Sequence, residues 1–137
     1  LRRPPSRFPA RRSGPRVGSM TAERNLIVFA ALNGALAVAL GAFAAHGAGP
    51  QIKTLLQTGC HYQLGHAVFA LACALWTGGG GLARLAGWLG ASGGLVFSLA
   101  LGAIGLLSLP AMGAVAPIGG LLMIAGWLCL AFAALRS

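Results

Sequence analysis

The sequence predicts an all-α fold, an integral membrane four-helix up-down bundle. Hydrophobic residues make up 57% of the 137 residues and charged residues only 8%, whereas a typical soluble domain is about 25% charged. Four long apolar stretches lie between Asn25 and Leu135, and only Lys53 and Arg84 are charged within that range. The connections between the stretches are short and contain glycine, so neighbouring helices must run antiparallel.

A basic leader, residues 1–19, precedes the predicted transmembrane domain, residues 20–137. The leader holds six of the ten basic residues of the chain: Arg2, Arg3, Arg7, Arg11, Arg12 and Arg16. It has too few apolar side chains to offset the entropy of ordering, so we expect it to be disordered. We favour a misplaced start, because Met20 begins a natural opening sequence. A basic arm on anionic lipid and an organelle transit peptide are the alternatives.

The first predicted span covers residues 25–45, where Asn33 is the one strongly polar residue. Its length matches the roughly 20 residues that cross a bilayer. The second helix is expected to run from about Pro50 to Trp76, since its fully apolar part is short alone and Pro50 suits a first helical turn. We place its membrane-embedded part at residues 59–77 and expect the preceding part to be amphipathic.

The third and fourth spans are predicted at residues 85–107 and 114–135, separated by Pro110. Neither contains a charged residue. Basic residues near span ends favour the cytoplasmic side, and an inside amino terminus places Arg24, Arg84 and Arg136 there, with Lys53 outside. We therefore expect both termini to be cytoplasmic.

The composition argues against several functional classes. The formal charge of +9 suggests nucleic-acid binding, but from Met20 onward the balance is four basic residues against one acid, and no basic face with aromatic readers follows. We therefore expect no nucleic-acid partner. Glu23 is the only acid and no nucleophile has a base beside it, so we expect no enzyme, no catalytic residue, no resident metal and no cofactor.

Small residues are expected to pack the helices. The third span carries a stripe at successive i+4 positions, and the first span carries a weaker one. Such stripes let helix backbones approach closely in lipid. The sequence leaves open whether they join helices of one chain or of two chains. The stripe residues are Ala86, Gly90, Gly94, Ser98 and Gly102 in the third span, and Ala37, Gly41 and Ala45 in the first.

A cluster of polar side chains forms the candidate site: His46, Gln57, Tyr62, Gln63 and His66. Polar side chains are costly in a membrane, so each supports a functional hypothesis. Helical spacing puts Tyr62 and His66 on one face of the second helix, with Gln63 beside them and Gln57 nearly opposite. We expect this cluster in the outer half of the membrane, with Tyr62 and Gln63 suited to the headgroup region.

Three motifs in order resemble those of the YgdD-like family of small four-span membrane proteins of unknown function. They are Gly41-Ala-Phe-Ala-Ala-His46, Gln57-Thr-Gly-Cys-His-Tyr62-Gln-Leu-Gly-His66, and Pro117-Ile-Gly-Gly120 with Gly126-Trp127. The resemblance covers about Arg24 to Leu135. It implies a four-helix fold and a multi-pass location in the bacterial cell (inner) membrane. The signature positions that it implies are His46, Gln57, Tyr62, His66 and Pro117, and we group Pro117 with the packing residues.

Three functional hypotheses follow, all with the lipid bilayer as the surroundings. We favour a structural or interaction protein that binds itself or another membrane protein. The second hypothesis is a small oligomeric transporter or channel in which the histidine-containing cluster forms an outer vestibule. The third is a metal or haem site between spans one and two, which would join His46 and His66.

Overall fold

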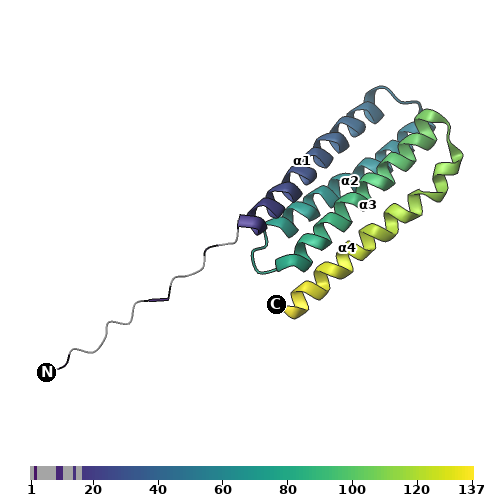
Figure 1. The fold of residues 1–137 in the computed structure, drawn as a ribbon. Helices are drawn as coiled ribbons and strands as arrows, with labels where there is room; N and C mark the ends of the chain where they lie inside the picture. The colour runs from purple at the N-terminus through teal and green to yellow at the C-terminus, as the bar shows by residue number, and fades with distance from the viewer. Residues whose placement is uncertain (1, 3–8, 11–13, 15–16) are drawn as a thin grey trace.

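In a computed structural model the chain is all-α, and residues 2, 9–10, 14 and 17–137 are described. The elements are α1 (Val17–His46), α2 (Pro50–Leu75), α3 (Gly80–Leu107), the short 3-10 helix η1 (Pro110–Ala114) and α4 (Ala116–Arg136). The four long helices run alternately up and down (Figure 1). The predicted all-α class and the four helices are confirmed.

The helix bounds differ from the predicted spans mainly at the amino ends. The first helix begins at Val17, so residues 17–19 are helical although we placed them in a disordered leader. The helix of Met20 to Glu23 extends backwards by three residues to Val17, although Gly18 is a weak helix former. Most of the predicted leader lies outside the described residues. The second helix is continuous from Pro50 to Leu75, in agreement with the prediction.

The turns follow from particular residues. Pro50 occupies the first turn of α2, where a missing backbone N–H costs nothing. Ser108 ends α3 in the left-handed conformation, with φ 51°, and Pro110 then begins η1. The kinked connection to α4 therefore comes from a left-handed cap followed by proline.

The helices lie side by side in chain order. The first helix packs mainly on α2 and α4 packs mainly on α3, so α2 and α3 form the centre and α1 and α4 the two edges (Figure 1). The start of α1 is joined to the start of α3, where Glu23 Oε1 lies 4.0 Å from Arg84 Nη1. The amino ends of α1 and α3 are therefore at the same end of the molecule.

Three helical segments are long and apolar enough to cross a membrane: Met20–His46, Gly80–Leu107 and Pro110–Arg136. Among the described helices, α2 does not meet this criterion, because its first half contains polar residues such as Lys53, Gln57 and His61. Large apolar side chains are exposed on every long helix, including Leu32, Val68, Leu99 and Leu121. An apolar exterior of this kind suits lipid and not water.

The small-residue stripe of α3 lies against α2 of the same chain. A Cβ added at Gly94 would lie 3.2 Å from the Cα of Gln63, and one added at Gly90 would lie 2.6 Å from the ring of Phe69. Farther along, a Cβ added at Gly59 of α2 would lie 3.1 Å from the Cα of Ser98, and one added at Gly102 would lie 3.8 Å from the side chain of Leu56. The stripe therefore joins two helices within one chain.

A second glycine face of α3 packs on α4. A Cβ added at Gly119 would lie 2.6 Å from the backbone nitrogen of Phe97, and one added at Gly93 would lie 2.7 Å from the carbonyl oxygen of Gly119. A Cβ added at Gly126 would lie 2.9 Å from the backbone nitrogen of Gly90. The backbones of α3 and α4 thus touch at positions where no side chain fits.

The neighbouring residues Gly119 and Gly120 provide a test of this packing. Gly119→Ala should destabilise the protein by about 1–3 kcal/mol, because the added methyl meets backbone that has no rotamer to change. Gly120→Ala places its methyl in open space and should be neutral or stabilise by up to about 1 kcal/mol through helix propensity. Unfolding of both variants in mild detergent measures the difference, and equal stability would contradict the close contact.

Candidate functional site

The predicted polar residues Tyr62, Gln63 and His66 lie at the middle of α2. Tyr62 follows Pro50 by twelve residues, which is about 18 Å along the helix, and α2 ends at Leu75. The neighbouring helices also pack on this part of α2 through residues in their interiors, since Gly41 of α1 faces Cys60 and Gly94 of α3 faces Gln63. Tyr62, Gln63 and His66 therefore lie at the centre of α2 and not near its amino end. Their expected depth in the outer half of the membrane stays a prediction.

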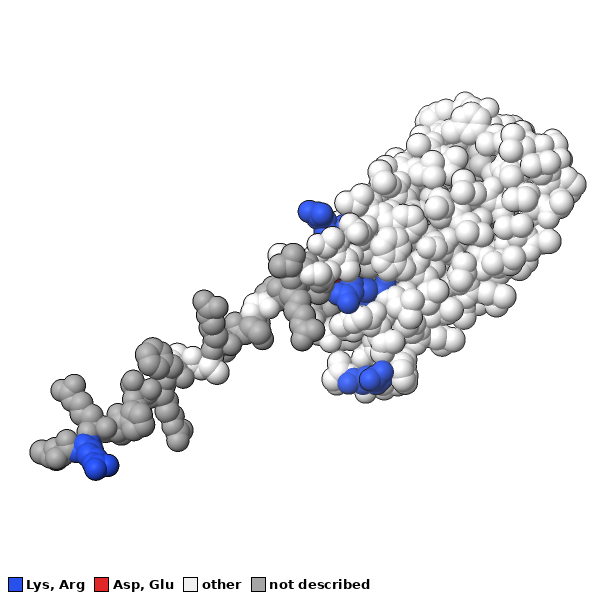
Figure 2. Space-filling view, viewed as in Figure 1, with Lys and Arg blue, Asp and Glu red and all other residues white. Residues whose placement is uncertain are grey.

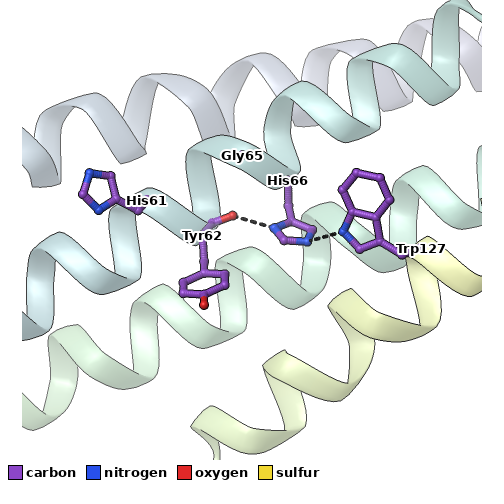
Figure 3. A pocket seen from close by; sticks show the side chains of 5 residues that line it. All are labelled: His61, Tyr62, Gly65, His66 and Trp127. Carbon is purple, nitrogen blue, oxygen red and sulfur yellow. Dashed lines mark hydrogen bonds between the residues drawn. The ribbon is translucent and has the colours of Figure 1, made fainter.

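His66 links two helices that are far apart in the sequence. Trp127 Nε1 of α4 donates to His66 Nε2 over 3.0 Å, and His66 Nδ1 lies 2.7 Å from the carbonyl oxygen of Tyr62, as Figure 3 shows. An indole N–H only donates and a carbonyl oxygen only accepts. His66 must therefore be neutral with its proton on Nδ1, and both of its nitrogens are engaged.

Aromatic rings surround this hydrogen-bonded pair. The rings of Phe69 and Trp127 lie 4.3 Å apart, and the Tyr62 ring meets Phe97 edge-on at 5.1 Å. Edge-on and tilted contacts of this kind are the favoured geometries of aromatic pairs. These contacts connect α2, α3 and α4 around His66.

Two hollows adjoin the pair and share three side chains, Tyr62, His66 and Trp127. One hollow, of about 220 Å³, is completed by His61 and Gly65 (Figure 3). The other, of about 400 Å³, is completed by Phe97 and by residues of α4. Tyr62 and His66, at the centre of α2, therefore line a cleft between α2 and α4.

Gln63 points to the other side of α2, toward α1. Its Nε2 donates to Asn33 Oδ1 over 3.1 Å, and Asn33 Nδ2 donates to the carbonyl oxygen of Phe29 over 3.0 Å. Asn33 and Gln63 are 3% and 1% exposed. Gln63 Oε1 has no hydrogen-bond partner among the described residues. This buried amide pair joins the two helices and is not part of the cleft.

His46 is separated from Tyr62, Gln63 and His66. It is the last residue of α1, twelve residues beyond Gly34, which faces Ala67. Twelve residues correspond to about 18 Å along a helix, so His46 and His66 of one chain cannot share an ion. The predicted metal or haem site between these two residues is therefore wrong for a single chain. Within the described part of the chain, no three histidine, cysteine or acidic residues are grouped to hold a metal.

The exposed side of the first half of α2 is polar. We name Thr54, Gln57, Thr58 and His61 the polar stripe; Gln57 is half-buried and the other three are exposed. The two threonine hydroxyls are satisfied by carbonyl oxygens one turn earlier, at 3.3 and 3.0 Å. Gln57 and His61, at i and i+4, lie on the same side of the helix.

Sequence reasoning missed two partners. Trp127 was seen only as part of a motif, because nothing local connects it to a histidine 61 residues away. Asn33 was noted as the one polar residue of its span, and a second buried amide at Gln63 was the available signal for their pairing. Polar residues that recur in two apolar helices frequently bond to each other across the interface.

Comparison with known proteins now gives the family. A family model described as "Protein of unknown function (DUF423)" matches residues 40–120, which include the polar stripe, the cleft residues of α2 and the start of α4. The chain belongs to the DUF423 family. The predicted resemblance to small membrane proteins of unknown function is confirmed at this level.

Relatives of the DUF423 chain are named as membrane proteins. A UPF0382 membrane protein of Staphylococcus epidermidis is 36% identical over 115 residues, covering 80% of this chain and 94% of the relative. The UPF0382 membrane protein YwdK of Bacillus subtilis is 33% identical over 117 residues, covering 80% and 95%. One from Haemophilus influenzae is 38% identical over 118 residues, covering 81% and 94%. No solved structure matches the chain significantly.

The hydrogen bond from Trp127 gives a spectroscopic prediction. Nitrogen-15 NMR of histidine-labelled protein should show His66 neutral and protonated at Nδ1. Trp127→Phe should destabilise the protein by about 0.6 kcal/mol, with about 1.7 kcal/mol as the upper limit for hydrogen bonds of this kind in membranes. A His66→Ala protein identifies the His66 signals. A proton on Nε2 in the unsubstituted protein would contradict the assignment.

Proposed function

We propose that this DUF423 chain is a multi-pass protein of the bacterial cell (inner) membrane that acts through binding and performs no catalysis. Its four long helices would each span the bilayer, both termini would be cytoplasmic, and the polar stripe of α2 would bind a second copy of the chain. The observation that carries the proposal is the polar stripe itself, which is exposed where the other helices expose apolar side chains. The finer YgdD-like assignment within the family stays a prediction.

The contact between Glu23 and Arg84 supports a spanning α2. It places the starts of α1 and α3 at the same end of the molecule, so if α1 crosses the membrane, α2 must carry the chain back before α3 begins. At 26 residues, α2 is about 39 Å long, and the hydrocarbon core is about 30 Å thick. α2 is then long enough to span the bilayer, and it is less apolar than the other three helices because one of its faces is polar.

The distribution of basic residues supports the cytoplasmic termini. Described basic side chains gather at the end of the molecule where the chain begins, and the opposite end carries none in this view (Figure 2). Arg24 and Arg84 lie near the starts of α1 and α3, and Arg136 is the last residue of α4, so in an up-down bundle all three lie at one end. Lys53 lies near the start of α2, at the other end. Positively charged residues close to span ends are retained on the cytoplasmic side.

The polar stripe supports a self-association surface. In lipid, the amide of Gln57 and the imidazole of His61 would lack the hydrogen-bond partners that water supplies. Amide and neutral imidazole groups each donate and accept, so the same surface on a second copy is complementary across a two-fold axis. Around a higher-order axis, the stripes would instead line a polar path, which is the arrangement that the transporter or channel hypothesis requires.

Cysteine cross-linking tests the proposal. After the three native cysteines are replaced by alanine, Thr58→Cys on the polar stripe should form disulfide-linked dimers in native membranes under mild oxidation. The matched control is Leu121→Cys, an exposed apolar position on α4, which should remain monomeric. His61→Leu should weaken the Thr58→Cys cross-link because it removes a hydrogen-bonding group from the interface.

Equal cross-linking at the two positions would mean random collision in the membrane and would overturn the proposal. A monomeric mass in mild detergent, together with no cross-link at Thr58→Cys, would overturn it as well. A trimer or larger oligomer that cross-links through Thr58→Cys would direct the next experiment to solute flux in vesicles.

Labelling from outside the cell tests the spans and their orientation. In the same cysteine-free background, Gln51→Cys should react with a membrane-impermeant maleimide in intact spheroplasts, because it lies at the external end of α2. Ser137→Cys should react only after the membrane is opened. Labelling of Ser137→Cys in intact spheroplasts would contradict cytoplasmic termini, and protection of both positions would contradict a spanning α2.

A further inference from the structure

The α2–α4 cleft has an aromatic lining and opens at the lipid-facing surface. We define it by Tyr62 and His66 of α2, Phe97 of α3, and Gly120, Met123, Ile124 and Trp127 of α4. Its volume of about 400 Å³ falls within the range of small-molecule sites, about 300–1,000 Å³. Tyr62, Ile124 and Trp127 are 51%, 57% and 54% exposed, so a molecule in the bilayer can reach it.

Tyr62 supplies the hydrogen-bonding group that is free in this cleft. The Trp127 N–H is used by His66, and both ring nitrogens of His66 are used by Trp127 and the Tyr62 carbonyl oxygen. The Tyr62 hydroxyl makes no hydrogen bond with any described residue, while its ring packs against Phe97. A phenol without an acceptor in hydrocarbon is unfavourable by a few kcal/mol, so the cleft calls for a ligand that accepts one hydrogen bond.

The position of Tyr62 along α2 restricts the ligand. It lies twelve residues from Pro50 and thirteen from Leu75, or about 18–20 Å from either end of the helix. Phospholipid headgroups and ester carbonyls lie at the borders of a hydrocarbon core that is about 30 Å thick. They cannot reach the middle of α2 if α2 spans the bilayer. The acceptor must belong to a molecule that dissolves in the bilayer interior.

The aromatic lining of the cleft further restricts the chemical class of the ligand. Tyr62 and Trp127 both line the cleft, and flat rings pack against aromatic side chains in offset or edge-on geometry. An acyl chain would fill the volume but would leave the Tyr62 hydroxyl unpaired. A planar ring that carries a carbonyl group satisfies both the shape and the hydrogen bond.

We propose that the α2–α4 cleft binds a lipid-soluble quinone, with the ring between Tyr62 and Trp127 and one carbonyl oxygen accepting the Tyr62 hydroxyl proton in a hydrogen bond. The self-association surface of the proposed function borders this site, because His61 lines the smaller hollow together with Tyr62, His66 and Trp127. The cleft of about 400 Å³ is itself lined without His61. Both inferences share the premise that α2 spans the bilayer.

Trp127 reports on its own cleft. In a Trp76→Phe/Trp88→Phe protein it is the only tryptophan left, and a bound quinone should quench its fluorescence. Titration of detergent-solubilised full-length protein with decylubiquinone should give quenching that saturates at one quinone per chain. Tyr62→Phe should raise the dissociation constant about two- to tenfold, as expected for loss of one hydrogen bond.

Two glycine variants separate binding in the cleft from binding elsewhere. Gly120 lines the cleft and a Cβ added there meets nothing within 4 Å, so Gly120→Leu should fill the cleft, leave the fold intact and abolish saturable quenching. Gly113→Leu, at another open position, should bind as the parent does. Thermal unfolding in the same detergent shows that each variant is folded.

Four results would overturn the proposal. The first is quenching that rises linearly with quinone and is equal in all variants, which is collision within the micelle. The second is saturable quenching that Gly120→Leu leaves unchanged, which places the quinone elsewhere. The third is equally effective competition by an alkylbenzene that has the same chain length but no carbonyl, and the fourth is an unchanged dissociation constant in Tyr62→Phe. Either of the last two would mean that the cleft selects only apolar volume.

Discussion

The backbone-to-backbone approach of α3 to its two neighbours is the contact on which the rest of the structure depends. In lipid there is little hydrophobic drive between helices, so packing at close range must hold them together. Gly94 gives α2 access to one side of α3, and Gly93 gives α4 access to the other. Because α2 and α4 are both held against α3, His66 and Trp127 come within hydrogen-bonding distance although neither helix packs extensively on the other.

The polar residues of α2 are divided among three directions. Gln63 turns toward α1 and bonds to Asn33 in the interior. His66 and Tyr62 turn toward α4 and line a cleft. Gln57 and His61 lie on the polar stripe, where His61 is exposed and Gln57 half-buried. The polar residues of α2 therefore contribute to a hydrogen bond with α1, to the cleft beside α4 and to the polar stripe. These three roles must be tested separately.

The sequence was sufficient for the helices and insufficient for their cross-links. Apolar length, Pro50 and Pro110 located the four helices, because lipid requires helical segments of a minimum length. Their carboxyl ends agree within two residues, whereas α1 begins eight residues and α3 five residues before the predicted spans. The i+4 spacing of Gly90, Gly94 and Ser98 indicated an interface, but periodicity cannot state which neighbour fills it. The hydrogen bond between His66 and Trp127 depends on how α2 is aligned with α3 and on how α4 is aligned with α3. No local sequence pattern encodes these two alignments. His46 was grouped with His66 because both are histidines in or near predicted spans. The alignment of α1 with α2 places them far apart along the helix axes.

The two glycine faces of α3 also bear on how this protein can move. Gly93 and Gly94 are adjacent in the chain, yet they face opposite neighbours, so a rotation of α3 that relieves one contact tightens the other. A shift by one residue in one sense would turn Leu95 toward Gln63, where only a hydrogen atom now fits. The close contacts at Gly93 and Gly94 therefore oppose rotation of α3 in either sense, and the same contacts fix the register that brings Trp127 to His66.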